Sequence, residues 1–153
     1  MDISILNHQS VLDIDDKLEK VLEDLIQMAI VEEDLDYEGE VSIMFVDDEE
    51  IHQLNKMHRD KDSPTDVLSF PQYESIKDAE EVDPYIILGD VVISTETAMR
   101  QADSFGHSLM REIGFLVVHS MFHLFGYDHD TEENTKEMRE KEEKVLSSYN
   151  LTR

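Results

Sequence analysis

The sequence predicts an α/β fold in a single domain, on three observations. Short runs rich in β-branched residues alternate with longer segments whose apolar residues recur every three or four positions. A chain of 153 residues lies in the usual size range of one domain and can bury a hydrophobic core without disulfides. No internal repeat, low-complexity tract or linker rich in Pro, Gly and Ser divides it. We therefore expect one domain over residues 1–153, an α/β sandwich around a small sheet.

The first four predicted elements occupy residues 3–59. Ile3 to Leu6 is a short strand, and a helix follows whose apolar face begins at Val11. The run from Val41 to Val46 is a second strand, and the acidic segment from Asp47 leads into a helix that ends near Arg59. The apolar face of the first helix consists of Val11, Ile14, Leu18, Val21, Leu25 and Met28.

Two more strands follow a loop at residues 60–64 that contains Asp60, Asp62, Ser63 and Pro64. They are Val67 to Phe70 and Ile86 to Ile93, both rich in β-branched and aromatic residues. The polar insert between them, Gln72 to Asp83, is predicted to be an exposed loop.

Three helices complete the predicted order. One begins at Thr95 and breaks at Gly106, and the next runs from about Ser108 to Phe125. Asp130 followed three residues later by Glu133 matches a capping box, which predicts a final charged helix ending near Tyr149. Periodicity does not give the order or direction of the strands.

The charge balance excludes a broad electrostatic grip on nucleic acid. There are 37 acidic and 13 basic residues, and the formal net charge is −24. One local cluster of cationic or potentially cationic side chains stands out, formed by Lys56, His58, Arg59 and Lys61. From composition alone, an ordinary solvated helix end is the better interpretation of this cluster.

The sequence indicates neither secretion nor a membrane span. Residues 1–10 lack a basic region followed by an apolar run, and no stretch approaches the ~18 apolar residues that a membrane span needs. We expect a cytoplasmic protein without membrane association. Because there are no cysteines, any metal must be held by His, Asp or Glu.

Three histidines form the strongest motif of the chain. His119 and His123 are four residues apart, on one face of the predicted helix, and Gly126 can take a positive φ that turns His129 back toward them. Three neutral imidazoles suit one divalent ion, with zinc the leading candidate, and leave a fourth position open as in catalytic sites. Buried structural histidines are the alternative, which the combined spacing disfavours.

The spacing is that of the metzincin proteases, but one essential residue differs. Ser120 follows the first histidine, where those enzymes hold a general-base Glu, and a hydroxyl cannot replace a carboxylate base. Peptide hydrolysis is therefore disfavoured, while cleavage of a phosphodiester with a metal and a cation stays plausible. Asp128, next to His129, either orients a ligand or caps the turn.

Three separate blocks resemble one known family, the YbeY family of bacterial rRNA-maturation endoribonucleases. They are the three-histidine motif, the segment Pro64 to Pro71 preceded by Arg59, and the segment Leu88 to Ser94. The resemblance runs from about Leu54 to Asp130, and the blocks occur in the order of the family. The family usually has Gly where this chain has Ser120 and Leu where it has Phe125, and neither change removes a ligand.

The resemblance implies a single α/β domain with a mixed, mostly parallel four-stranded sheet and about five helices. It implies one zinc ion on His119, His123 and His129, with His123 also catalytic, and cleavage of single-stranded RNA. It also implies a role in 16S rRNA 3′-end maturation and in quality control of the 70S ribosome. The expected partners are rRNA, the small subunit and ribosome-associated proteins.

Arg59 matches an Arg that the family needs for activity, and its planar fork suits a phosphate. Lys61 and Ser69 are further expected substrate contacts. Whether water or the 2′-OH is the nucleophile stays open. The alternatives are a metalloprotease without the usual Glu base and a metal-stabilised ribosome-binding module without catalysis.

Overall fold

Four strands form one sheet in the order β1-β2-β4-β3. The computed structural model describes residues 1–35, 38–76, 79 and 84–151. The strands are β1 (Asp2–Asn7), β2 (Glu38–Val46), β3 (Val67–Pro71) and β4 (Tyr85–Ser94). β1, β2 and β4 are parallel, and β3 is antiparallel to β4. The expected mixed, mostly parallel sheet is confirmed.

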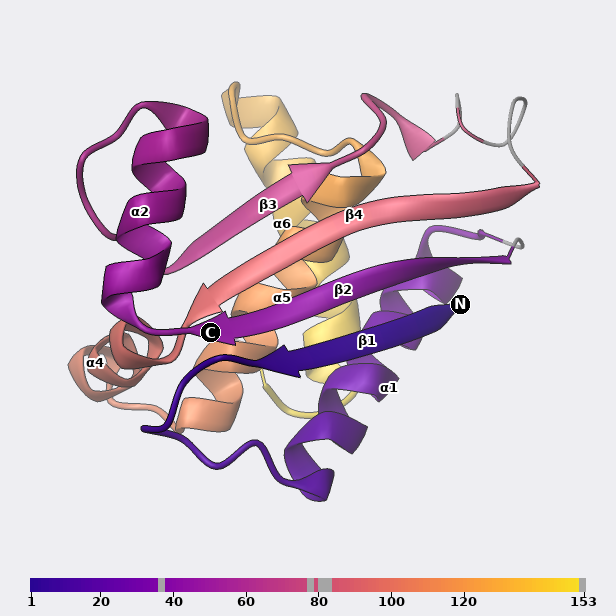
Figure 1. Ribbon diagram of the computed structural model, residues 1–153. Coiled ribbons are helices and arrows are strands. Elements are labelled where there is room, and N and C mark those ends of the chain that lie inside the picture. Colours follow the sequence, from indigo (N-terminus) through magenta and orange to yellow (C-terminus); the bar gives the residue numbers. More distant parts are fainter. Residues whose placement is uncertain (36–37, 77–78, 80–83, 152–153) are drawn as a thin grey trace.

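Within the described residues, five helices of 11 or more residues accompany this sheet, so the expected fold class is also confirmed. They are α1 (Asp16–Glu32), α2 (Asp48–Arg59), α4 (Thr95–Phe105), α5 (Leu109–Phe125) and α6 (Glu132–Ser147). In Figure 1, α1, α5 and α6 lie together on one side of the sheet, while α2 and α4 lie at the end where β2 and β4 finish. No helix in the described part of the chain is long and apolar enough to cross a membrane.

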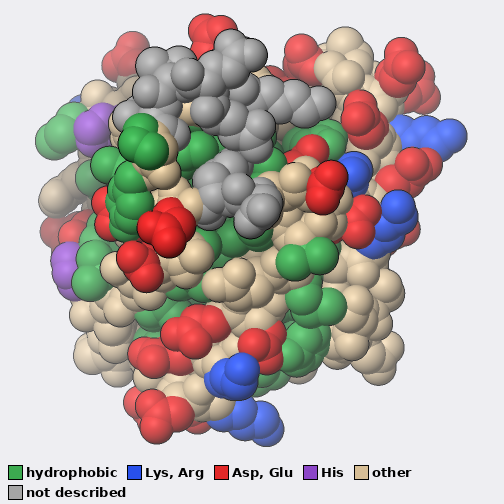
Figure 2. All heavy atoms as spheres, turned by 90° about the vertical axis from the view of Figure 1, so that its right-hand side faces the viewer, with side chains coloured by type: hydrophobic (Ala, Val, Ile, Leu, Met, Phe, Trp, Pro, Cys, Tyr) green, Lys and Arg blue, Asp and Glu red, His purple; other side chains and the backbone are tan. Residues whose placement is uncertain are grey.

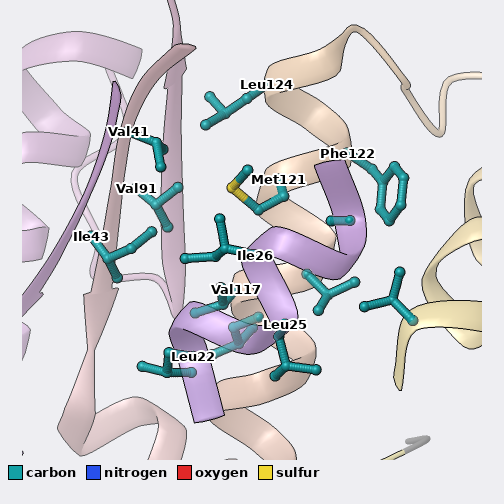
Figure 3. Packing of buried hydrophobic residues seen from close by; sticks show 14 of the residues in the cluster. Leu22, Leu25, Ile26, Val41, Ile43, Val91, Val117, Met121, Phe122 and Leu124 are labelled. Carbon is teal, nitrogen blue, oxygen red and sulfur yellow. The ribbon is translucent and has the colours of Figure 1, made fainter. Parts of the chain in front are cut away.

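The main core lies between the sheet and the helix layer. Figure 3 shows Leu22, Leu25 and Ile26 of α1 packed between sheet residues and the side chains of α5. β-branched residues such as Val41 and Val91 cover the facing side of the sheet. The core holds α5 firmly, and α5 carries two of the three motif histidines.

A smaller apolar cluster lies on the opposite face of the sheet. It joins Ile51 of α2 to Val46, Leu68 and Val92, one residue from each of three strands. Val91 and Val92 belong to different clusters because successive strand residues point to opposite faces. This cluster fixes α2 against β3 and β4, and so sets where Arg59, its last residue, is placed.

The first helix begins later than its apolar spacing predicts. Asp15 is the N-cap and accepts a hydrogen bond from the Leu18 amide at 2.8 Å, whereas Val11 is 54% exposed. The Gln9 side-chain oxygen accepts from the amides of Val11 and Leu12. This local turn removes residues before Asp15 from the helix, because a cap residue and a turn both satisfy amides that a helix would leave to solvent.

Two other predictions are corrected. Thr131, not Asp130, is the N-cap of α6, and its hydroxyl accepts from the Asn134 amide at 3.0 Å. The predicted loop from Gln72 to Asp83 is not wholly exposed, since Ile76 and Ala79 are helical and buried in the main core. Their apolar side chains, three residues apart, explain the burial. Residues 77–78 and 80–83 of this predicted loop lie outside the described residues.

Candidate metal centre

The three motif histidines converge at the end of α5. His119 and His123 lie one turn apart on the same face of the helix, and the chain turns after Phe125 to bring His129 beside them. One ring nitrogen from each histidine lies within 4.8 Å of the others. Three imidazoles at this separation can coordinate one ion together.

Gly126 makes the turn possible. Its φ is +111°, a value that L side chains rarely adopt, and its amide donates to the His123 carbonyl oxygen at 3.0 Å. The Tyr127 amide donates to the Phe122 carbonyl oxygen, also at 3.0 Å. A Cβ on Gly126 would lie 2.9 Å from the Glu74 carbonyl oxygen, so a larger residue meets both strain and a clash.

Hydrogen bonds orient two of the imidazole rings. His119 Nδ1 lies 2.6 Å from Glu142 Oε1, and His123 Nδ1 lies 3.0 Å from the Tyr127 carbonyl oxygen. Both partners accept, so each Nδ1 carries the proton and each Nε2 presents a lone pair. The two Nε2 atoms face each other at 3.1 Å. Two facing lone pairs repel, and a cation between them and His129 removes the repulsion, so this donor set fits a divalent ion.

The protonation of His123 favours the same conclusion. Burial lowers the pKa of the His123 imidazole, and the neighbouring His119 lowers it further, against the effect of the Tyr127 carbonyl. A lowered pKa keeps the ring neutral, which is the form that binds metals. The site is therefore prepared for a cation.

Asp128 touches His129 in two ways. Its Oδ1 atom accepts from the His129 amide at 2.7 Å and lies 3.6 Å from His129 Nδ1. The first contact caps the turn, and the second is a loose contact between exposed side chains. Both roles considered for Asp128 are thus compatible with its position.

A cavity of about 520 Å³ opens in front of the histidines. Its lining includes the three histidines His119, His123 and His129 together with Arg59 and Ser69. Arg59 Nη2 donates to the Ser69 carbonyl oxygen at 3.1 Å, which holds the guanidinium over β3. Lys61 is exposed and is not among the described residues that line this cavity.

Ser120 lies away from this cavity. It is fully buried, and its hydroxyl has no hydrogen-bond partner among the residues that the structure describes. It lines neither of the two hollows beside the histidines. The residue that replaces the general base of the metzincins therefore cannot reach a substrate at the histidines.

Comparison with known proteins supports one family. The family model described as endoribonuclease YbeY matches residues 4–150. The chain belongs to the YbeY family. YbeY members from two bacteria align along the whole chain. The endoribonuclease YbeY of Clostridioides difficile is 48% identical, covering 100% of this chain and 99% of its own. That of Alkaliphilus oremlandii is 47% identical, covering 100% of both chains.

The fold is also found among solved structures. The solution structure of TM1509 from Thermotoga maritima matches with a TM-score of 0.58 and 25% identity, covering 96% of this chain and 91% of that one. The predicted YbeY resemblance is confirmed, and with it the enzyme class, an endoribonuclease that hydrolyses RNA.

Sequence reasoning missed Glu142. It lies on α6, is 5% exposed and is hydrogen-bonded to His119. A signal was available, because Glu142 stands in the apolar stripe of α6, four residues after Met138 and three before Val145, both buried. A carboxylate in a buried stripe needs a partner, and here the partner is a motif histidine.

Proposed function

We propose that this chain is a zinc-dependent, single-strand-specific endoribonuclease that acts in 16S rRNA 3′-end maturation and ribosome quality control. One observation carries the proposal: Arg59 and the three histidines line the same cavity, although α2 and α5 are far apart in the sequence. A cation and a metal site facing one cavity suit a phosphodiester.

One zinc ion per chain fits the donor set. The set has three imidazole nitrogens and no thiolate, and a site with three protein ligands keeps a position open for water or substrate. Zinc in such a site supplies Lewis-acid stabilisation of developing charge and activates water at neutral pH. His119, His123 and His129 are the proposed ligands.

Arg59 is the proposed phosphate-binding group. The Ser69 carbonyl oxygen accepts a hydrogen bond from one N–H group of the guanidinium. The remaining N–H groups can donate to two oxygens of one phosphate. Ser69 is 8% exposed, so its main contribution is to hold Arg59 through the backbone. Lys61 lies next to this region on the exposed surface, where it adds positive charge without lining the cavity.

The size of the cavity supports a single-stranded substrate. Pockets of about 300–1,000 Å³ hold one small ligand, and a cavity of about 520 Å³ matches a nucleotide or two. A base-paired segment does not unstack to enter such a space without losing pairing and stacking energy. A flexible strand pays no such cost.

The strongly acidic surface supports a ribosomal setting. In Figure 2, Asp and Glu side chains are spread over the face shown, and Lys and Arg side chains gather at few places. With a net charge of −24, free RNA is repelled over most of the surface. The small subunit, or a protein bound to it, would supply the docking energy. Action on ribosomes also implies a cytoplasmic site of action.

Two alternatives stand against this proposal. A metalloprotease needs a base that the fully buried Ser120 does not provide. A ribosome-binding module without catalysis predicts that the metal stabilises the fold, whereas the three-ligand set is of the open type. Neither alternative explains why Arg59 lines the same cavity as the histidines.

The deciding experiment pairs zinc analysis with RNA cleavage for the wild type, His123→Ala and a control, His52→Ala. His52 is a partly exposed histidine paired with Asp62, outside the cavity. We expect His123→Ala to lose zinc and cleavage while its circular dichroism spectrum is retained, and His52→Ala to keep both. Full cleavage by repurified His123→Ala would overturn the catalytic proposal. Unfolding of His123→Ala would support the binding module, and cleavage of an unstructured protein would support the protease.

A further inference from the structure

A second cavity adjoins His119 and His129, and Arg59 is not among the residues that line it. It measures about 410 Å³ and lies between α5 and α6, lined among others by Phe115, Met138 and Arg139. His119 and His129 line both this cavity and the one that contains Arg59. Two of the three motif histidines therefore border two cavities.

The lining of the second cavity combines an aromatic ring with a cation. Phe115 is partly buried, and its ring stacks on that of His119 with centroids 5.5 Å apart and planes at 20°. Arg139 is exposed and forms no ion pair with a described residue, whereas Lys141 and Lys144, on the same helix, pair with Glu32. Base stacking on an aromatic ring and a phosphate on a guanidinium are the usual contacts to single-stranded RNA.

Two carboxylates also line this cavity, and they act differently. Glu142 already accepts a hydrogen bond from His119. Glu143 is exposed and places a negative charge near Arg139, so it disfavours a phosphate there. Arg139 thus attracts a phosphate in this cavity and the exposed Glu143 repels it, so variants of these two residues should have opposite effects.

We propose that this second cavity binds the nucleotide on the far side of the cleaved phosphodiester from Arg59, with its base near Phe115 and its phosphate on Arg139. The inference rests on the proposed function. A strand cut at the histidines must continue in both directions, and the Arg59 cavity accounts for only one of them. The second cavity is lined by two of the same histidines, and its volume of about 410 Å³ lies in the range of about 300–1,000 Å³ that is usual for pockets holding one small ligand.

The test uses the zinc-loaded full chain and a set of single-stranded oligoribonucleotides that share one cleavage site. The oligonucleotides end either one nucleotide or about four nucleotides beyond the cut, on one side or the other. In the wild type, we expect KM to fall as either side is lengthened. Arg139→Gln should raise KM about tenfold for oligonucleotides lengthened on one side only, because a phosphate contact and its orienting effect on a stacked base are lost.

The matched control is Lys136→Gln, which removes the same charge from an exposed position of α6 outside the cavity. It should leave all KM values unchanged. Glu143→Gln should lower KM on the side that Arg139→Gln affects. Phe115→Leu should raise KM for oligonucleotides lengthened on that side. Phe115→Trp, which keeps an aromatic ring, should leave KM as in the wild type. Zinc content, measured for every variant, separates a lost nucleotide contact from a displaced His119.

The outcomes distinguish this inference from the function on which it rests. If the wild type cleaves no oligonucleotide, the proposed function fails and the subsite with it. Suppose instead that the wild type cleaves, but that lengthening the oligonucleotide lowers KM for Arg139→Gln as much as for the wild type, or as much as for Lys136→Gln. The subsite alone is then overturned. If Arg139→Gln raises KM equally for oligonucleotides lengthened on either side of the cut, the subsite is also overturned, because the effect is then a general one of charge.

Discussion

Glu142 Oε1 lies 2.6 Å from His119 Nδ1, and the contact joins α6 to the helix that holds two of the three motif histidines. The carboxylate is 5% exposed. It fixes the ring so that Nε2 points to His123 Nε2, 3.1 Å away. A carboxylate behind a histidine ligand both orients the imidazole and makes it a stronger donor.

Glu142→Gln should weaken zinc binding by about tenfold, because the amide keeps the shape of the side chain but loses its charge. The measurement is zinc competition against a chromophoric chelator. Glu140→Gln is the control, an exposed glutamate of the same helix with the same loss of charge. If both variants bind zinc as the wild type does, the Glu142 contact only connects two helices.

Arg59→Gln should lower kcat/KM for RNA by about a hundredfold, the usual effect of removing a donor that stabilises developing charge. Zinc content should not change, because Arg59 is no ligand. Lys56→Gln, at an exposed position of α2, is the matched control, and Lys61→Gln tests the surface cation beyond the cavity. We expect Lys61→Gln to raise KM only slightly. Retained turnover in Arg59→Gln would make Arg59 a surface charge.

Local patterns predicted the elements well, and they failed where a side chain competes with the pattern. The strands coincide with short apolar runs that contain β-branched or aromatic residues, so their positions follow from the sequence. The apolar spacing that begins at Val11 continues into α1. The helix itself begins only after the N-cap Asp15, because the Gln9 side chain holds Val11 in a turn. The mostly parallel arrangement was implied by the family resemblance, and the strand order was not predicted, because alternation tells which residues share a face and not which strands are neighbours.

The same distinction applies to the site. His119, His123 and His129 lie on one helix end and its turn, so local geometry alone brings them together. Arg59 reaches the cavity only because the Ile51 cluster packs α2 against β3. Glu142 depends on how α6 packs on α5. Contacts between distant segments leave no periodic pattern in the sequence, so they cannot be predicted from it. For Glu142, the only signal was its position in the apolar stripe of α6.

Zinc affinity should fall as the pH falls below about 6.5, the ordinary pKa of a histidine. Protons compete with the metal for each imidazole. Because burial lowers the pKa of His123, this ring stays neutral and able to coordinate at a pH where a free imidazole is already protonated. The loss should therefore be less steep than three independent imidazoles would give. Isothermal titration at several pH values measures it, and unchanged affinity at pH 5 would contradict an all-histidine site.

Gly126→Ala should reduce both zinc content and stability. A φ of +111° is strained for alanine, and the new Cβ would meet the Glu74 carbonyl oxygen at 2.9 Å. We expect a loss of about 1–3 kcal/mol in the free energy of unfolding and weaker zinc binding, because the turn that presents His129 must shift. Gly106→Ala is the control: it also has a positive φ, +69°, but a Cβ there meets no described atom within 4 Å. Urea denaturation with parallel zinc analysis would show whether only Gly126→Ala loses metal.

Asp48→Asn should lower the free energy of unfolding by about 1–2 kcal/mol at neutral pH. Asp48 accepts hydrogen bonds from Ser94, Thr97 and Arg100, which join the start of α2 to α4. Burial raises the pKa of Asp48, but these three bonds outweigh it and hold the pKa below its ordinary value of 3.8.

The sign of the pH dependence follows from that lowered pKa. Near pH 3.8 the unfolded chain binds a proton at Asp48 that the folded chain does not, so the stabilisation is present above that pH and is lost as the pH falls through the folded pKa. The difference between wild type and Asp48→Asn should therefore shrink as the pH falls below 3.8. Glu49→Gln is the control. It removes a charge from an exposed position in the same first turn of α2, so it has the same effect on the helix dipole but breaks none of the three hydrogen bonds. Equal losses in the two variants, measured by urea denaturation from pH 7 to pH 3, would show that the dipole and not the bonds holds α2 in place.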